Sequence, residues 1–217
     1  MSNDANILYD ELETWCQVHQ AHPVWQYSVP LLGEGGTCSL FGELDPEPFS
    51  LQSVLNEDQL ALVPQVQAIV DWVKEKTNLD WFGIYLKRQT QESDYVLTKL
   101  AYFGAPSRAE FPLTQQFAQI SNNSKVGLTG EERVINDVCA YTAQGGEYYT
   151  CDPKVQSELC WPILTLDLQD KISPAAYQDE HILGIIDAEC FETDCFDAQT
   201  QAIFRAVCRK LSQLLAK

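Results

Sequence analysis

The chain has 217 residues, which is about the size of one ordinary domain with an extension. Hydrophobic residues make up 45% of it, enough to bury a core, so a wholly disordered chain is excluded. The 31 acidic residues outnumber the 14 basic ones and give a formal net charge of −17. This field repels phosphate backbones and anionic lipid headgroups, so we expect neither nucleic acid nor a membrane surface as a partner.

The N-terminal segment has neither the basic start nor the continuous apolar stretch of a secretory signal. The longest apolar runs, such as "HILGII", are too short to span a bilayer. These features predict a cytoplasmic protein.

Residues 5–20 are predicted to form a helix because Leu8, Leu12 and Trp15 recur on one face, and Pro23 ends it. Residues 23–56 contain Pro, Gly and isolated aromatic residues without a clear period, which is typical of loops. We interpret residues 1–56 as an N-terminal extension that wraps a single domain formed by residues 57–217.

The domain itself alternates helical and strand patterns, and its sequence contains a long polar loop at 138–156 and a polar insert at 167–180. The predicted elements are a helix at 57–77, a hairpin of strands at 81–87 and 95–103, a short strand at 109–113, a short helix at 113–124, strands at 132–137, 157–166 and 181–190, and a helix at 197–215.

This order predicts an α+β fold: an antiparallel sheet with the N- and C-terminal helices packed on one face. Loops would then cover the other face, and a pocket would lie beneath them. Long loops tend to carry function, so the 138–156 loop is the first candidate to border that pocket.

Eight cysteines are scattered through the chain without any C-x-x-C pair: Cys16, Cys38, Cys139, Cys151, Cys160, Cys190, Cys195 and Cys208. Zinc sites use tighter paired spacings, so we do not expect a metal. In a cytosolic chain of this length, the cysteines are expected to be reduced and mostly to fill the core as small apolar residues.

Alternate residues of a strand face the same way, so Asp187 shares a face with Glu189, and Glu158 shares one with Cys160. If the strands at 157–166 and 181–190 pair, three carboxylates converge beneath the loop that carries Cys151. Like charges buried together raise at least one pKa, and a neutral carboxylic acid can donate a proton. The alternative is that these acids are solvent-facing residues of an edge strand and a strand entrance.

The segments "DWFGIYL", "CDPKVQSELCWPI" and "LGIIDAEC" occur in an order and spacing that resembles the free methionine-(R)-sulfoxide reductases, a branch of the GAF-domain proteins. The resemblance covers roughly residues 57–215 and implies a GAF-like fold. It implies that Cys151 is the nucleophile and that Glu158, Asp187 and Glu189 bind the substrate, free methionine sulfoxide. Asp187 or Glu189 would also supply the catalytic proton, and Tyr85 would line the pocket.

Several positions depart from that family. Two cysteines expected upstream are missing, and Glu147 and Tyr148 replace a glycine-histidine pair. The resolving thiol must then come from elsewhere, and we select Cys139, twelve residues before Cys151, while an external thiol stays open.

The resemblance implies no bound cofactor, a thioredoxin-like or other thiol reductant, and leaves a homodimer open. Two other hypotheses remain: a non-catalytic GAF-type module that binds a small molecule as a sensor, and a structural relative without a ligand.

Overall fold

The computed structural model describes residues 3–33, 42–149, 152–169 and 179–216. Six α-helices are found in these ranges: α1 (Asn3–Val18), α2 (Glu57–Lys76), α3 (Asn122–Thr129), α4 (Val138–Ala143), α5 (Leu166–Gln169) and α6 (Ala198–Leu215). Eight strands accompany them: β1 (Gln26–Tyr27), β2 (Phe49–Ser50), β3 (Trp81–Gln89), β4 (Tyr95–Phe103), β5 (Glu110–Pro112), β6 (Arg133–Ile135), β7 (Ser157–Leu164) and β8 (Ile182–Cys190).

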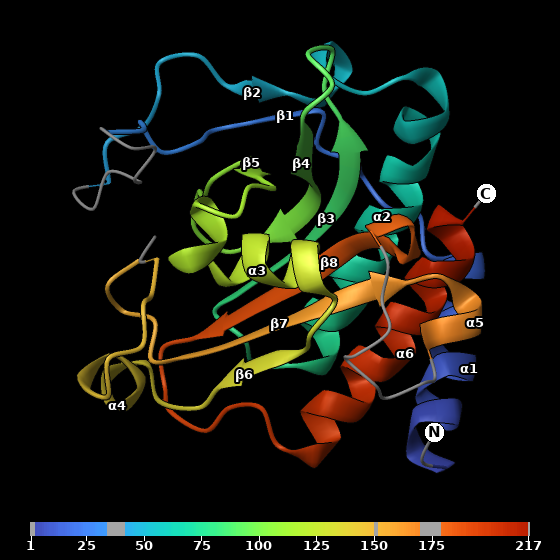
Figure 1. Ribbon diagram of the computed structural model, residues 1–217. Coiled ribbons are helices and arrows are strands. Elements are labelled where there is room, and N and C mark those ends of the chain that lie inside the picture. The colour runs from blue at the N-terminus through green and yellow to red at the C-terminus, as the bar shows by residue number, and fades with distance from the viewer. Residues whose placement is uncertain (1–2, 34–41, 150–151, 170–178, 217) are drawn as a thin grey trace.

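The centre of the fold is a six-stranded antiparallel sheet with the strand order β5-β4-β3-β8-β7-β6 (Figure 1). The predicted hairpin is confirmed, because β3 pairs with β4. The predicted pairing of the last two long strands is confirmed as well, because β7 pairs with β8. The α+β prediction is therefore correct, and the two strands that carry the candidate acids lie side by side inside the sheet.

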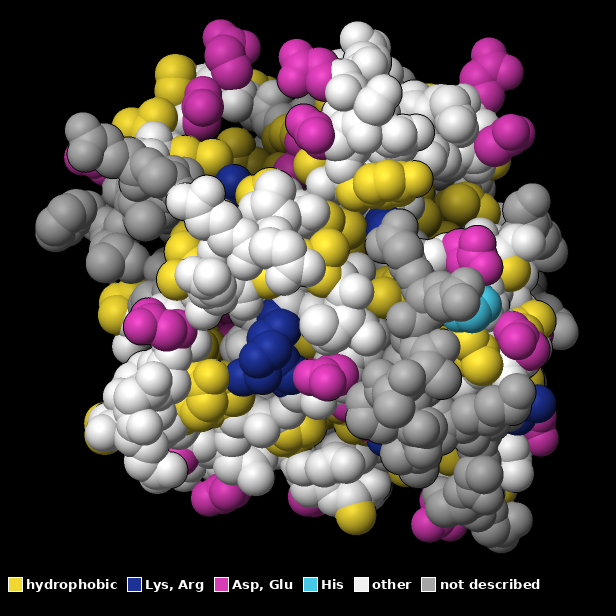
Figure 2. All heavy atoms as spheres, in the orientation of Figure 1, with side chains coloured by type: hydrophobic (Ala, Val, Ile, Leu, Met, Phe, Trp, Pro, Cys, Tyr) yellow, Lys and Arg dark blue, Asp and Glu magenta, His cyan; other side chains and the backbone are white. Residues whose placement is uncertain are grey.

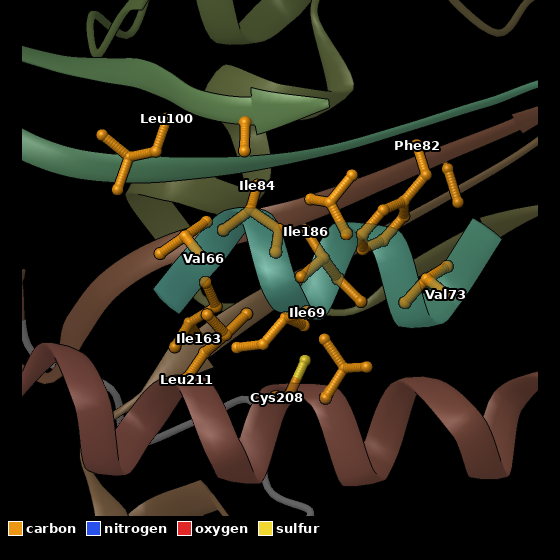
Figure 3. Packing of buried hydrophobic residues seen from close by; sticks show 14 of the residues in the cluster. Val66, Ile69, Val73, Phe82, Ile84, Leu100, Ile163, Ile186, Cys208 and Leu211 are labelled. Carbon is orange, nitrogen blue, oxygen red and sulfur yellow. The ribbon is translucent and has the colours of Figure 1, made fainter. Parts of the chain in front are cut away.

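One face of the sheet packs against α2 and α6, and Figure 3 shows the apolar side chains between them. Helix α2 starts where predicted because Asn56 and Gln59 form a reciprocal capping box. Helix α6 starts after Asp197, whose carboxylate accepts the Thr200 amide. Figure 3 labels the residues that fill this layer: Val66, Ile69, Val73, Phe82, Ile84, Leu100, Ile163, Ile186, Cys208 and Leu211.

The opposite face, which we call the site face, carries α3 in addition to loops (Figure 1). The predicted helix at 113–124 is instead a 3-10 turn at Phe117–Gln119 followed by α3, which starts near the predicted end. Ser121 decides this start, because its hydroxyl caps the helix by accepting the Ser124 amide. Helix α3 packs on β7 and β8, so the expectation that loops alone cover this face was wrong.

The polar stretch at 138–156, predicted as a loop, begins with the short helix α4. Asp137 caps this helix by accepting the Ala140 amide at 2.8 Å. The stretch therefore reaches the sheet as a helix followed by a shorter loop that leads into β7.

The N-terminal extension contributes structure to both faces of the sheet. Helix α1 packs against α6 and α2 on the helical side. The following segment pairs β1 with β2 and runs across the top of the view in Figure 1, above β5. Within it, a 3-10 turn at Leu51–Ser53 buries Leu51 completely.

The cysteine expectation was wrong for one pair, because Cys190 and Cys195 form a disulfide across a separation of five residues. Cys190 ends β8 on the core side, and the short loop that follows returns Cys195 to it. Elsewhere among the described residues, Cys160 and Cys208 are buried free thiols, as predicted for core cysteines.

Acidic side chains are spread around the surface rather than gathered in one patch on the face that Figure 2 shows. Within the described ranges, no helix is both long and apolar enough to cross a membrane.

Candidate functional site

Three acidic side chains meet on the site face, where β7 and β8 run side by side. Glu158 on β7 lies directly opposite Glu189 on β8, and Cys160 lies opposite Asp187. Opposed residues in such a ladder have Cβ atoms about 4.5–5.5 Å apart, and diagonal neighbours follow within about 7–8 Å. The structure thus brings together the three carboxylates that the sequence singled out, and the edge-strand alternative does not hold because β7 and β8 are interior strands.

Burial dominates the electrostatics of this cluster. Glu158 and Asp187 are 5% and 4% exposed, and Glu189 is half-buried. Burial raises the pKa of each of the three carboxyls, and for Asp187 and Glu189 the neighbouring negative charges raise the pKa further, to well above the usual range. At neutral pH the cluster therefore favours holding at least one proton.

Two adjacent asparagines at the start of α3 donate hydrogen bonds to this cluster. The Asn122 side-chain amide donates to Glu158 Oε1 at 2.9 Å, and the Asn123 amide donates to Asp187 Oδ2 at 2.8 Å. Both asparagines are buried, at 7% and 6% exposure. Because amide donors stabilise the ionised carboxylate, they oppose the effect of burial at these two acids.

Arg133 and Tyr148 complete the surroundings of Glu158. The Arg133 guanidinium donates to Asn122 Oδ1 at 2.8 Å and so fixes which end of that amide faces Glu158. The Tyr148 hydroxyl donates to Glu158, and burial followed by the nearby acids raises the pKa of this phenol far above its usual value. Tyr148 occupies a place where the resembled family has histidine, and it contacts the cluster here.

One oxygen of Asp187 has no hydrogen-bond partner among the described residues. Its Oδ1 atom is buried and accepts no hydrogen bond from the described residues. An unpaired carboxylate oxygen in the interior is costly, so a proton or a donor on a ligand would be stabilised there.

Trp81 on β3 continues the row formed by Glu158 and Glu189, since it lies opposite Glu189. Its indole lies over Gly83, where a Cβ atom would come within 2.3 Å of the ring. Gly104, with a φ of +108°, closes the other side, and the indole nitrogen donates to the Ala105 carbonyl at 3.0 Å. These two glycines allow a flat aromatic wall beside the acids.

A fully buried cation, Lys99 on β4, lies behind this wall. Its ammonium is 3.9 Å from the ring centroid of Tyr102, 5.0 Å from that of Tyr27 and 5.6 Å from that of Trp81. It donates to the Ser107 carbonyl at 2.9 Å and to the Ser107 hydroxyl at 2.6 Å. Its charge lowers the pKa of Asp187 and Glu189, against the rise that burial causes. Nothing in the local sequence around Lys99 marks it as part of the site, so this cation was missed.

A cavity of about 370 Å³ adjoins the acids through Glu189. Trp81 and Phe191 also line it, and Asp152, Pro153 and Lys154 form the side that leads toward β7. Glu158 and Asp187 are not among its described lining residues. The volume is in the range of small-molecule sites, which run from about 300 to 1,000 Å³.

The remaining predicted residues are distributed unevenly. Cys151 lies outside the described residues, although Asp152, which follows it directly, lines the cavity. Cys139 is an exposed thiol on α4. Tyr85 lies on the site face but is 1% exposed and packs in an aromatic cluster with Phe111, away from the cavity lining.

Among the residues that the structure describes, no group of three or more histidine, cysteine, aspartate or glutamate side chains is arranged to hold a metal ion. The acid cluster instead provides acceptors, one partly exposed carboxyl and a bordering aromatic surface. Such a set suits a small ligand that carries an ammonium group.

The sequence matches no protein-family model, and a comparison with curated proteins found no match either. Solved structures do resemble the fold. The type II free methionine-R-sulfoxide reductase from Thermoplasma acidophilum is 21% identical with a TM-score of 0.55, and the match covers 73% of this chain and 95% of the reductase. The GAF domain of the Acinetobacter phosphoenolpyruvate-protein phosphotransferase is 13% identical with a TM-score of 0.55, and covers 100% of this chain and 95% of that domain. The fold is therefore GAF-like.

Proposed function

We propose that the protein is a thiol-dependent reductase of free methionine-(R)-sulfoxide, with Cys151 as the nucleophile. The observation that carries this proposal is the meeting of Glu158, Asp187 and Glu189 on one face of the sheet. Of the three, Glu189 lines a small cavity that is also lined by Asp152, the residue next to Cys151. The GAF-like fold, shared with the Thermoplasma reductase, is consistent with it.

In this reaction the carboxylates have two roles. Glu158 and Asp187 accept amide hydrogen bonds that oppose the rise in their pKa caused by burial, and an ammonium group on the substrate would favour their ionised forms further. Glu189 accepts no hydrogen bond from the described residues, lines the cavity and has a strongly raised pKa. The pKa of Asp187 is also raised well above its usual value, so our choice of Glu189 over Asp187 as the acid that donates the proton rests on its place in the cavity lining.

The chemical step moves one oxygen atom and two electrons. The Cys151 thiolate attacks the sulfoxide sulfur while the Glu189 proton moves to the sulfoxide oxygen. The hydroxyl group then passes from the methionine sulfur to the Cys151 sulfur as the bond between the two sulfurs breaks, so that Cys151 becomes a sulfenic acid and methionine leaves. The cysteine sulfur is oxidised by two electrons and the methionine sulfur is reduced by two.

A second thiol must then reduce the sulfenic acid, which releases water and forms a disulfide. Cys139 remains our candidate because it is an exposed free thiol on α4, at the start of the segment that contains Cys151. A thioredoxin-like protein or another thiol would reduce the disulfide. Cys160 does not suit this role, because it is 1% exposed and burial raises the pKa of its thiol well above the usual value.

A GAF-type sensor that binds a small molecule without chemistry is the second candidate. The observation that favours it is the Acinetobacter GAF domain, which reaches the same TM-score as the reductase. Such a module would use the same acids to hold its ligand. It would bind free methionine sulfoxide or another small ammonium compound and release it unchanged.

The deciding experiment measures methionine release from free L-methionine-(R)-sulfoxide with dithiothreitol as reductant. We expect turnover in the wild type and none in Cys151→Ser, while Cys16→Ser, a half-buried thiol outside the site, stays active. Full activity in Cys151→Ser refutes the nucleophile. Binding without turnover in the wild type favours the sensor. For recycling, Cys139→Ser should keep single-turnover release and lose thioredoxin-driven steady turnover.

A further inference from the structure

The N-terminal extension reaches the candidate site. Residues 25–32 and 42–50, which we call the arm, form an antiparallel pair held by the β1–β2 ladder and by a bridge between Pro30 and Leu44. Backbone hydrogen bonds from Leu31 to Glu43 and from Asp45 to Val29, each 2.9 Å long, continue the pairing. The arm is therefore an ordered ribbon along the part of it that the structure describes.

The base of the arm is fixed to the sheet beside the acid cluster. Tyr27 is 6% exposed, and its hydroxyl donates to the Lys99 carbonyl at 2.7 Å. Its ring packs edge-on against Tyr102 at 5.4 Å and lies 5.0 Å from the Lys99 ammonium. The same ammonium lies 5.6 Å from the Trp81 ring, which borders Glu189. A continuous set of contacts thus joins the arm to the wall of the site.

The outer part of the arm faces the cavity that adjoins Glu189. Pro30, Gly42, Glu43 and Leu44 from the arm line it together with the segment Asp152–Lys154. Leu44 is 46% exposed, because its side chain lies at this open surface rather than in the core. Without these residues the cavity would be an open groove on the site face.

The side chains that line the cavity carry mostly negative charge. Among the described residues that line it are four carboxylates, from Glu43, Asp80, Asp152 and Glu189, and one ammonium, from Lys154. The arm thus supplies one of the four acids in addition to its apolar residues. Such a cavity attracts a ligand with a free ammonium group and repels an anionic one.

We propose that the arm is the specificity element of the site: Pro30 and Leu44 form the wall that limits the size of the molecule that reaches Glu189. The ligand class is a small amino acid with a free ammonium group, and the identity of the reaction rests on the function proposed above. A bulkier or N-acylated relative would meet the arm before it met the acids. The extension is then part of the functional site.

The first test reads access to the cavity without any substrate. In Glu189→Cys, the new thiol is labelled with a small methyl or a bulky benzyl methanethiosulfonate, and mass spectrometry of the peptide containing residue 189 gives both rates. Adding Leu44→Trp should lower the benzyl rate about tenfold or more relative to the methyl rate. Adding Leu44→Ala should raise the benzyl rate relative to the methyl rate. Leu31→Trp, an exposed arm residue outside the cavity lining, is the matched control and should change neither.

The second test uses the protein with Glu189 in place. Leu44→Trp should lower kcat/KM for free methionine sulfoxide about tenfold. Leu44→Ala should lower the ratio of kcat/KM for free methionine sulfoxide to kcat/KM for N-acetylmethionine sulfoxide. The proposal is overturned if Leu44→Trp leaves the rate of benzyl labelling unchanged. It is also overturned if Leu44→Trp leaves kcat/KM for free methionine sulfoxide unchanged. If the labelling responds as expected but the wild type does not reduce methionine sulfoxide, the reductase proposal fails and the size-limiting wall stands.

Discussion

The two faces of the sheet are built from the same strands and differ in almost every other respect. On β7, Leu159 and Trp161 enter the helical core, while Glu158 and Cys160 face the site. The core side is packed mainly by apolar side chains. The site face buries acidic side chains whose like charges repel one another, so it contributes less to the stability of the fold. In return it retains groups that can take part in chemistry.

The faces also differ in where their partners come from. The core side is closed by long helices with regular apolar stripes, such as Val63, Val66 and Val70 on α2. The site face is covered by short segments from distant parts of the chain: the start of α3 with Asn122 and Asn123, the loop with Tyr148, and the arm. Mutations on the two faces should consequently have opposite effects on stability, and three variants test this.

The largest effect is expected in the core. Phe204 on α6 is fully buried and stacks on Phe82 with their ring centroids 5.6 Å apart. Phe204→Ala removes this contact and leaves a cavity, so the free energy of unfolding should fall by about 3–5 kcal/mol. Urea unfolding measures it, and Val134→Ala at the exposed side of β6 should change it by less than about 0.5 kcal/mol. A loss as small as that of the control would contradict the packing of α6 on the sheet.

An intermediate effect is expected at the disulfide that follows β8. The bond closes a loop of only about six residues, so the entropy it removes from the unfolded chain is worth about 2 kcal/mol. Cys195→Ser should therefore lose about that much stability in the absence of reductant.

In dithiothreitol the wild type and Cys195→Ser should unfold at nearly the same urea concentration. Cys16→Ser, a free thiol, is the control and should show no dependence on reductant. Equal stability of wild type and Cys195→Ser in both conditions would mean that the bond does not form in solution.

The sequence predicted the strand-borne half of the site well, because side-chain alternation is a local rule. It placed Asp187, Glu189 and Glu158 on one face once β7 and β8 were paired. It did not reveal Asn122 and Asn123, since their place over the acids depends on how α3 packs and no periodic pattern marks a polar pair at a helix start. Lys99 was missed for a related reason.

Lys99 lies within an apolar strand, and a lysine there is usually taken as an exposed residue. Its burial depends on Tyr27 from the extension, a contact between residues 72 apart in sequence. Cys190 and Cys195 are only five residues apart in the sequence, but the expectation of reduced cysteines argued against a bond between them. In each case the missing information was a tertiary contact.

The smallest change in the free energy of unfolding is expected at Glu189, and it is an increase rather than a loss. Burial and the charges of Asp187 and Glu158 raise its pKa well above the ordinary carboxyl value of about 4.3. Between that value and the raised one, the folded state holds a proton that the unfolded state has lost. The unfolded state thus binds fewer protons, and the free energy of unfolding falls as pH rises through this window.

Glu189→Gln removes this penalty, so the variant should be more stable than the wild type at pH 7 by about 0.5–2 kcal/mol. The difference should shrink toward zero near pH 4, where both states of the wild type are protonated. Urea unfolding across pH 4–8 measures it, with the exposed Glu131→Gln as a control that changes little. A Glu189→Gln variant that is less stable at pH 7 would mean that the ionised side chain is a net stabilising group. Glu189, the most exposed of the three site-face acids, would then stabilise the folded state as the core residues do. The proposed difference in stability between the two faces would be wrong.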